Sequence, residues 1–563
     1  MTTTPTMPLG RAVRSRPARR VGRFAAVDLG ATSGRVIVAE IDAEGAGADS
    51  PATPRSLNGD RPRSVAGEPR SREGAVRAGR FALTEIHRFA NAPVSREGHL
   101  RWDFEAIWAN VVEGLRRAAA TGPIDSVGID TWGADYGLLG ADGSLLDSPF
   151  CYRDRRTEGV PERVWDRIGP RRLYELTGSQ YQRFNTVFQL AAEPAERLAG
   201  ARSLLLMPEL LAHRLTGRVV AESTSASTTG LFDVRRRSWS DEAIDALALD
   251  RGLFADVLEP GDGIGQLTPQ VQAATGLGPG TMVVAVGGHD TASAVAAVPA
   301  SGTDFAYVSS GTWSLVGVER AEPVLSRASQ DANFTNELGV FGRVRHLKNV
   351  MGLWLLSECQ RDWAERGACP ALPELLAAAA AEPPGQALID ADHDQFLAPG
   401  DMPRRIARAV SAGGGRVPTG RAQTVRCIID SLAASYDRAV RQASALSGQA
   451  INRVHIVGGG SLNALLCQAT ADSTGLPVLA GPTEASVIGN AAVQAHAMGV
   501  IDGGLEQVRA LVADHFPVTA YGPGESAGGQ ARSLHGARCV GGTDTVQQDQ
   551  DVSLPNQPQK ESS

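Results

Sequence analysis

Lysine is almost absent from this chain, and its scarcity excludes two large classes of nucleotide-using protein. The 563-residue sequence has 55 basic residues, and only Lys348 and Lys560 among them are lysines. A P-loop NTPase needs a Gly-Lys-Ser/Thr tripeptide to reach the phosphates, and the chain has none. A protein kinase needs a strand lysine downstream of a Gly-rich loop, and Lys348 has no such context.

Cysteine is also scarce, and long apolar runs are missing. The six cysteines include no C-x-x-C pair, and no paired histidines accompany them, which excludes a disulfide framework and a zinc-site pattern. We therefore expect reduced thiols in a cytoplasmic protein. No run approaches about 18 consecutive apolar residues, so we expect no membrane partner. The net charge of −7 argues against a nucleic-acid partner.

The chain does contain enough apolar material, 42% of its residues, for more than one core. Three segments lack the apolar pattern: a basic extension at 1–22, a Pro-, Gly- and Ser-rich insertion at about 43–80, and a polar tail at 521–563. We expect the two ends to be disordered and the insertion to be flexible. Between these segments, short apolar strands alternate with helical stretches, a pattern typical of an α/β protein.

A glycine-containing turn joins two predicted strands, at 24–30 and 36–41, near the start of the ordered part. A Rossmann or P-loop site would have a helix after the turn, so this segment is neither of those nucleotide-binding sites. The backbone N–H groups of such a turn and the hydroxyls of Thr32 and Ser33 can converge on a phosphate. The segment also fits a plain β-hairpin with polar turn residues, and taken alone it does not decide between the two.

The same pattern returns later in the chain, with strands at 305–310 and 313–318 around a second glycine turn. Each hairpin is followed by a β run that ends in glycine, at 126–133 and at 453–460. Two copies of one topology predict a duplicated pair of domains, with the two turns facing each other across a nucleotide-binding cleft. The glycines at 458–460 would let a flat purine ring lie on the backbone, although a Gly triplet after a strand also fits a simple tight turn.

Asp290 is the candidate catalytic residue. It follows a predicted strand at 281–286 and a Gly-Gly turn, and it precedes a helical run at 292–298. An Asp in this place fits a helix N-cap. It also fits a carboxylate that accepts the proton of a sugar hydroxyl as that oxygen attacks phosphorus, and the two roles are compatible.

Seven motifs together resemble the FGGY carbohydrate kinases, and among them the kinases of L-rhamnulose. The motifs lie at 28–35, 128–133, 152–156, 289–291, 309–314, 347–352 and 455–460. The resemblance covers about 22 to 520. It implies two actin-like (ribonuclease-H-type) α/β domains with an interdomain cleft: 23–300 for sugar binding and catalysis, and 301–520 for ATP. It also implies phosphorylation of the 1-hydroxyl of L-rhamnulose in L-rhamnose catabolism, with ATP and Mg²⁺, by a monomer or weak homodimer.

The resemblance also implies which residues act. The proton acceptor would be Asp290. Contacts to ATP would come from Ala31, Thr32, Ser33, Gly34, Arg35, Thr312 and Gly459. Contacts to the ketose would come from Gly133, His289, Asp290, Thr291 and Asn349. Asp28 would face the phosphates and Mg²⁺, and we assign no direct metal ligand.

The sequence departs from the family pattern in places, and some alternatives stay open. Ser357 stands where the family has a glutamine that contacts ATP, so we do not carry that contact over. Cys427 lacks the second cysteine that would pair with it in one relative. Trp132 fits either a wall of the sugar site or core, and Lys348 receives no catalytic role. The rival functions are a kinase of L-fuculose or L-xylulose, and an ATP-binding regulator without catalysis.

Overall fold

The computed structural model describes residues 21–42, 80–367 and 369–524. The expectations for 1–20, 43–79 and 525–563 therefore lie outside the described residues. The ordered part begins earlier than predicted, because Val21 is already in the first strand and pairs with Asp42. Asp42 also pairs with Arg80, so the two ends of the predicted insertion are neighbours in one sheet.

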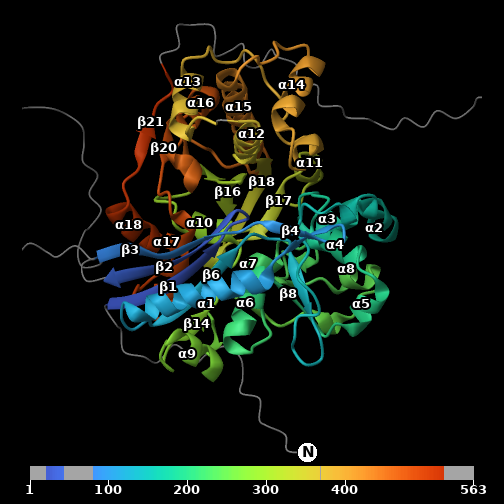
Figure 1. The fold of residues 1–563 in the computed structure, drawn as a ribbon, viewed down its shortest axis with the longest axis vertical. Helices are drawn as coiled ribbons and strands as arrows, with labels where there is room; N and C mark the ends of the chain where they lie inside the picture. The colour runs from blue at the N-terminus through green and yellow to red at the C-terminus, as the bar shows by residue number, and fades with distance from the viewer. Residues whose placement is uncertain (1–20, 43–79, 368, 525–563) are drawn as a thin grey trace, which may run out of the picture.

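Two mixed sheets form the framework of the molecule (Figure 1). In spatial order the first sheet contains β13 (Gly263–Gln266), β14 (Met282–Val284), β6 (Ser126–Thr131), β1 (Val21–Leu29), β2 (Ser33–Asp42) and β3 (Arg80–Ala90). The second sheet contains β17 (Thr335–Leu338), β18 (Val344–Met351), β16 (Trp313–Arg320), β15 (Phe305–Ser310), β19 (Arg453–Val457), β20 (Val478–Ala480) and β21 (Thr519–Tyr521).

The two sheets repeat one topology. In the first sheet β1, β2 and β3 run as an antiparallel meander, while β6 and β14 are parallel to β1. In the second sheet β15, β16 and β18 form the same meander, and β19 and β20 are parallel to β15. The predicted duplication is confirmed, because both glycine-turn hairpins begin an equivalent five-strand unit.

Helices cover these sheets with apolar faces. In the first half α1 (Phe104–Ala120) and α6 (Met207–Thr216) pack on the sheet, and their buried side chains share a core with β1 and β6. Helix α1 starts after Asp103, whose side chain accepts a hydrogen bond from the backbone N–H of Ala106. In the second half α12 (Trp354–Glu365), α15 (Arg421–Ser447) and α16 (Ala464–Thr474) surround a separate core. None of the helices within the described ranges is long and apolar enough to cross a membrane.

The two halves meet along α10 (Asp290–Ala296) and α17 (Ala485–Ala497), which lie at mid-height and left of centre in Figure 1. Side chains from both helices and both sheets belong to one shared apolar core. Polar contacts add to it, because Gln494 of α17 accepts a hydrogen bond from Ser126 (2.7 Å) and Asn490 donates one to Asp130 (2.6 Å). Helix α17 of the second half is therefore bonded directly to β6 of the first.

Candidate active site

A cavity of about 480 Å³ opens between the two halves, and both hairpin turns line it. The first half contributes Gly30, Ala31, Thr32 and Ser33, and the second contributes Ser309, Ser310, Gly311 and Thr312. The glycines Gly458 and Gly459, which follow β19, lie on the same wall as the second turn. The structure thus brings together the two turns that the sequence repeat predicted to face each other.

Nearly all of the predicted site residues line this cavity. They are Ala31, Thr32, Ser33, Arg35, Gly133, His289, Asp290, Thr291, Thr312, Asn349 and Gly459. Gly34 is the exception: it does not line the cavity, and a Cβ there would lie 2.3 Å from Cζ of Phe89 and 2.6 Å from Cδ2 of Leu29. Its glycine is therefore required by the packing behind the turn.

Asp290 is the first residue of α10, and its side chain keeps 32% of its surface exposed in the cavity. The N-cap interpretation is wrong, because His289 occupies the cap position and no side chain caps this helix. Burial raises the pKa of the Asp290 carboxyl, and the negative charge of Asp28 raises it further, while His289 acts in the opposite direction. A carboxylate with a raised pKa and a free edge in the cavity suits a proton acceptor.

The turn that precedes Asp290 is held from behind by Glu222 and Thr224. The Glu222 carboxylate accepts hydrogen bonds from the backbone N–H of Gly288 (3.0 Å) and from the Thr224 hydroxyl (2.5 Å). The Thr224 oxygen in turn accepts one from the backbone N–H of His289 (3.3 Å). Sequence reasoning missed these two residues, although the hydroxyl-rich run at 223–229 could have drawn attention to them.

A pair of carboxylates lies under the first turn. Asp28 and Asp130 are opposite each other on the parallel strands β1 and β6, and Asp130 is fully buried. Burial, and after it the charge of Asp28, raises the pKa of Asp130 well above its ordinary value. Arg35 forms ion pairs with Asp28 and with Glu484, which precedes α17, so it links the two halves at the cavity wall.

The opposite end of the cavity is held by amide and indole contacts. The Gln180 side chain accepts hydrogen bonds from the Asn349 backbone N–H (2.8 Å) and side-chain amide (3.1 Å). Trp132 lines the cavity, and its indole N–H donates to the buried Asp135 (3.0 Å), so it is both a wall of the cavity and part of the core. Burial raises the pKa of Asp135 to about 6. Sequence reasoning missed Gln180 and Asp135, which stand in no recognisable motif.

Lys348 and Ser357, to which the sequence analysis assigned no function, both lie outside the cavity. The ammonium of Lys348 donates to the Ala332 carbonyl (3.2 Å), and Lys348 does not line the cavity. Ser357 is an exposed residue of α12 that does not line the cavity either. Of the described lysine and arginine side chains, those of Arg35 and Arg88 line the cavity.

Comparison with known proteins gives consistent matches across the chain. Sequence profiles described as "FGGY family of carbohydrate kinases" match residues 83–297 (N-terminal domain) and 306–498 (C-terminal domain). A rhamnulokinase of Bacteroides thetaiotaomicron is 40% identical over 521 residues, 92% of this chain and 99% of that protein. A rhamnulokinase of Pectobacterium carotovorum is 40% identical over 509 residues, 89% of this chain and 93% of that protein.

Solved structures with low sequence identity share the fold. A xylulose kinase from Rhodospirillum rubrum matches with a TM-score of 0.67 at 16% identity, over 91% of this chain and 96% of that one. A gluconate kinase from Lactobacillus acidophilus also has a TM-score of 0.67, at 14% identity, over 92% of this chain and 96% of that one. These likenesses concern the two-domain architecture alone.

Proposed function

Because the chain belongs to the FGGY family of carbohydrate kinases, we propose that it transfers the γ-phosphoryl group of ATP to the 1-hydroxyl of L-rhamnulose. The choice of sugar is supported by the relatives at 40% identity, which are named rhamnulokinase and match nearly the whole chain. The observation that carries the reaction class is the position of Asp290, a carboxylate exposed in the cavity that both hairpin turns line.

In the proposed reaction, Asp290 accepts the proton of the 1-hydroxyl as that oxygen forms its bond to the γ-phosphorus. The bond between the γ-phosphorus and the bridging oxygen breaks, and ADP leaves. The N-terminal half (23–300) and Asn349 would hold the ketose, through Gly133 and the 289–291 turn. ATP would lie between residues 31–35 and the C-terminal half (301–520), at Thr312 and Gly459.

Mg²⁺ is the cofactor that we propose with ATP. Among the described residues, no three carboxylate, histidine or cysteine groups lie close enough to hold a metal ion. Mg²⁺ is commonly bound through one or two carboxylates, waters and the phosphates of the substrate, so this limited donor set fits it. Asp28 lines the cavity and would hold the ion through water. When bound, the ion supplies positive charge to the phosphates.

The thiols support a reducing compartment for this enzyme, and we propose the cytoplasm. The five cysteines in the described ranges are all free, and four of them are buried. Burial raises the pKa of the Cys427 thiol to about 12, which makes it a poor nucleophile. Cys539 lies outside the described residues.

A ketose panel tests the proposed substrate. We expect MgATP and L-rhamnulose to give the highest kcat/KM in a coupled ADP-release assay. We expect slow ADP release without sugar, because the closure that completes the catalytic arrangement needs the bound sugar. A higher kcat/KM with L-fuculose or L-xylulose would change the sugar and leave the reaction class standing. If no ketose stimulates ADP release, the kinase assignment fails.

Protonation of Asp290 should make the activity fall at acid pH. A general base must be ionised, and the pKa of Asp290 lies above its ordinary value because the group is buried. We therefore expect kcat/KM for the ketose to be constant near neutral pH and to fall as the pH drops through this raised pKa. A pH–rate profile measures it, with binding of ADP followed over the same range as the control. An acid limb at the ordinary aspartate pKa, about 3.9, would contradict the assignment.

A further inference from the structure

Strand β18 extends beyond the end of its neighbour β17, and the part that β17 does not cover contains Asn349. Pairing of β18 with β17 stops at Leu347, whereas its pairing with β16 continues to Met351. The N–H and C=O groups of a strand residue need other hydrogen-bond partners where the neighbouring strand has ended. At Asn349 a side chain from the other half of the molecule supplies them.

The side chain of Gln180 takes the place of the missing strand. Gln180 belongs to the first half, lies between α3 (Pro170–Thr177) and α4 (Thr186–Ala191), and is 3% exposed. Its Oε1 atom accepts a hydrogen bond from the Asn349 N–H (2.8 Å), and its Nε2 group donates one to the Asn349 C=O (3.3 Å). One side-chain amide thus satisfies both backbone groups of Asn349, as a paired strand residue would.

These two bonds fix which end of the Gln180 amide is oxygen. A backbone N–H can only donate and a backbone C=O can only accept, so exchange of the two amide atoms would place donor against donor and acceptor against acceptor. The same reasoning extends to the Asn349 side chain, because its amide lies 3.1 Å from the same Oε1 atom. Only the NH₂ group of Asn349 can donate to that oxygen, so Nδ2 is the atom that faces Gln180.

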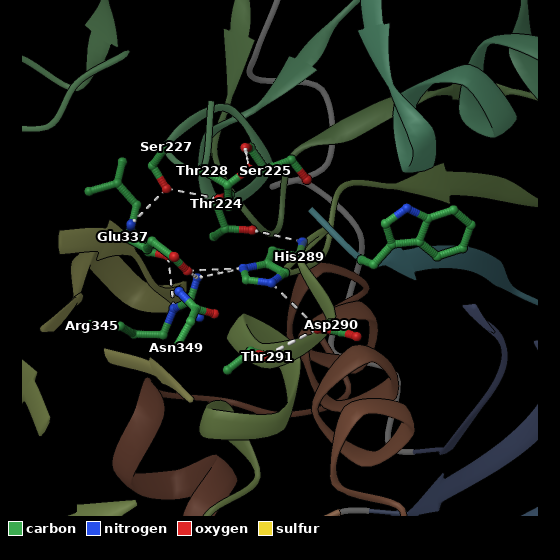
Figure 2. Close-up of polar contacts among 12 residues, drawn as sticks. Thr224, Ser225, Ser227, Thr228, His289, Asp290, Thr291, Glu337, Arg345 and Asn349 are labelled. Atoms are coloured by element: carbon green, nitrogen blue, oxygen red, sulfur yellow. Dashed lines mark hydrogen bonds and ion pairs between the residues drawn. The ribbon is translucent and has the colours of Figure 1, made fainter. Parts of the chain in front are cut away.

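The remaining polar atom of the Asn349 side chain is its carbonyl oxygen, Oδ1. Within the described ranges this oxygen has no hydrogen-bond partner, and Asn349 lines the cavity. In Figure 2 Asn349 lies on the same side of the site as Glu337 and Arg345, and Asp290 lies on the other side. A ligand between the two sides therefore meets an acceptor at Asn349, and an acceptor selects a group that can donate, such as a hydroxyl.

From these contacts we infer that Gln180 is a positioning residue that sets how the site recognises its sugar. It holds Nδ2 of Asn349 and leaves Oδ1 for the ligand, so Asn349 binds a ketose hydroxyl as a hydrogen-bond donor. A sugar without that hydroxyl leaves Oδ1 unpaired and is disfavoured. The inference rests on the proposed sugar kinase activity for its substrate, whereas the amide orientation can be tested without any substrate.

Gln180→Met is the kinetic test, because methionine has a similar length and no amide. The Asn349 amide is then free to turn, so we expect the KM for the ketose to rise and kcat/KM to fall about 10-fold, the size of one lost hydrogen bond. The contact is the same in the ground state and the transition state, so kcat should change little. The KM for ATP should also change little, because the proposed nucleotide contacts are elsewhere in the cavity.

Asn333→Gly is the matched control. The Asn333 side chain accepts a hydrogen bond from the Tyr181 N–H (2.8 Å) and donates one to the Tyr181 C=O (3.2 Å), so it is a second amide that joins the same two segments. It does not line the cavity, and its left-handed backbone (φ 55°) accommodates glycine. The control should keep its ketose kcat/KM. An equal loss in both variants would show general damage to the junction and would overturn the inference.

Analogues of the ketose that each lack one hydroxyl test the recognition itself. The analogue whose disadvantage disappears in Asn349→Ala identifies the hydroxyl that Asn349 binds. Gln180→Met should reduce discrimination against that same analogue and leave discrimination at the other hydroxyls unchanged, while Asn333→Gly should alter neither. Unchanged discrimination in Gln180→Met would contradict the inference, and so would an Asn349→Ala variant that still discriminates against every analogue.

Neutron diffraction from deuterated crystals of the unliganded protein tests the amide orientation directly, because it locates the deuterium atoms. We expect deuterium on the Asn349 side-chain atom next to Gln180 and none on the atom left for the ligand. The reverse arrangement would refute the inference whatever the substrate is. The expected arrangement in a protein without any ketose activity would support the assigned orientation and overturn the proposed function instead.

Discussion

Asp290→Asn is expected to lower ketose-dependent kcat about 10²- to 10⁴-fold, the usual contribution of a general base. The amide has nearly the same shape as the carboxylate, but it cannot accept the proton of the attacking hydroxyl. Binding of the ketose should persist, because the neighbouring contacts from His289, Thr291 and Asn349 remain in the cavity. The loss should therefore appear in kcat with little change in the dissociation constant for the sugar.

Two measurements decide this prediction. Coupled ADP release gives kcat, and calorimetric titration gives the ketose dissociation constant for native and variant proteins. Asp430→Asn is the control, since Asp430 is also a largely buried carboxyl with a raised pKa, but it lies in α15 outside the cavity. The control should keep its kcat. If Asp290→Asn lowers kcat by less than about tenfold, the loss is too small for the removal of a general base, and Asp290 is not the proton acceptor.

The same substitution should make the protein more stable at neutral pH. A carboxyl whose pKa is higher in the folded state than in the unfolded state favours folding when it is protonated, and that stabilisation is lost as the pH rises through the folded-state pKa. The raised pKa of Asp290 places it in this class. Asp290→Asn removes the buried charge, so we expect a higher Tm at pH 7 and a difference that shrinks in acid. A lower Tm at pH 7 would show that the carboxylate stabilises the native state.

The predictable parts of the fold are those that depend on residues close together in the sequence. Each hairpin is a short apolar run, a glycine turn and a second apolar run, and the strand pairing follows from the turn. The repeat of that pattern predicted the duplication, and the resemblance to a family predicted the residues of the cavity. Asp290 also belongs to a local pattern, since it starts a helix after a strand and a Gly-Gly turn.

The supporting contacts were not predictable in this way, because each one joins segments far apart in the sequence. Glu337 of β17 meets His289, the residue before α10, across 48 positions, and Glu222 reaches Gly288 across 66. Gln180 and Asn349 are 169 positions apart. No spacing rule connects such residues, because their meeting depends on tertiary packing within each half and between the two halves. The N-cap hypothesis for Asp290 failed for a related reason: the chain enters the helix one residue earlier than the pattern indicated, so His289 takes the cap position.

Helices α10 and α17 approach each other closely at Gly489. A substitution as small as Gly489→Ala should therefore have a large effect on stability. A Cβ at Gly489 would lie 1.8 Å from the backbone oxygen of Ser293 and 2.6 Å from its backbone carbon. Neither atom can move without the helix that contains it. Gly489→Ala should therefore lower the free energy of unfolding by about 3 kcal/mol or more, at or above the upper end for overpacking. Urea unfolding measures it.

Catalysis should fall together with stability in Gly489→Ala, because α10 begins at Asp290 and the next residue of α17, Asn490, is bonded to Asp130 under the first turn. A displacement on the order of 1 Å in a reacting group can cost about 100-fold in rate. We expect a loss of that size in ketose kcat/KM, measured under conditions where the variant is folded. Gly200→Ala is the control, since a Cβ there has no neighbour within 4 Å. If Gly489→Ala loses stability and keeps full kcat/KM, the helices relax away from the cavity, and the packing of α10 against α17 does not set the position of the base.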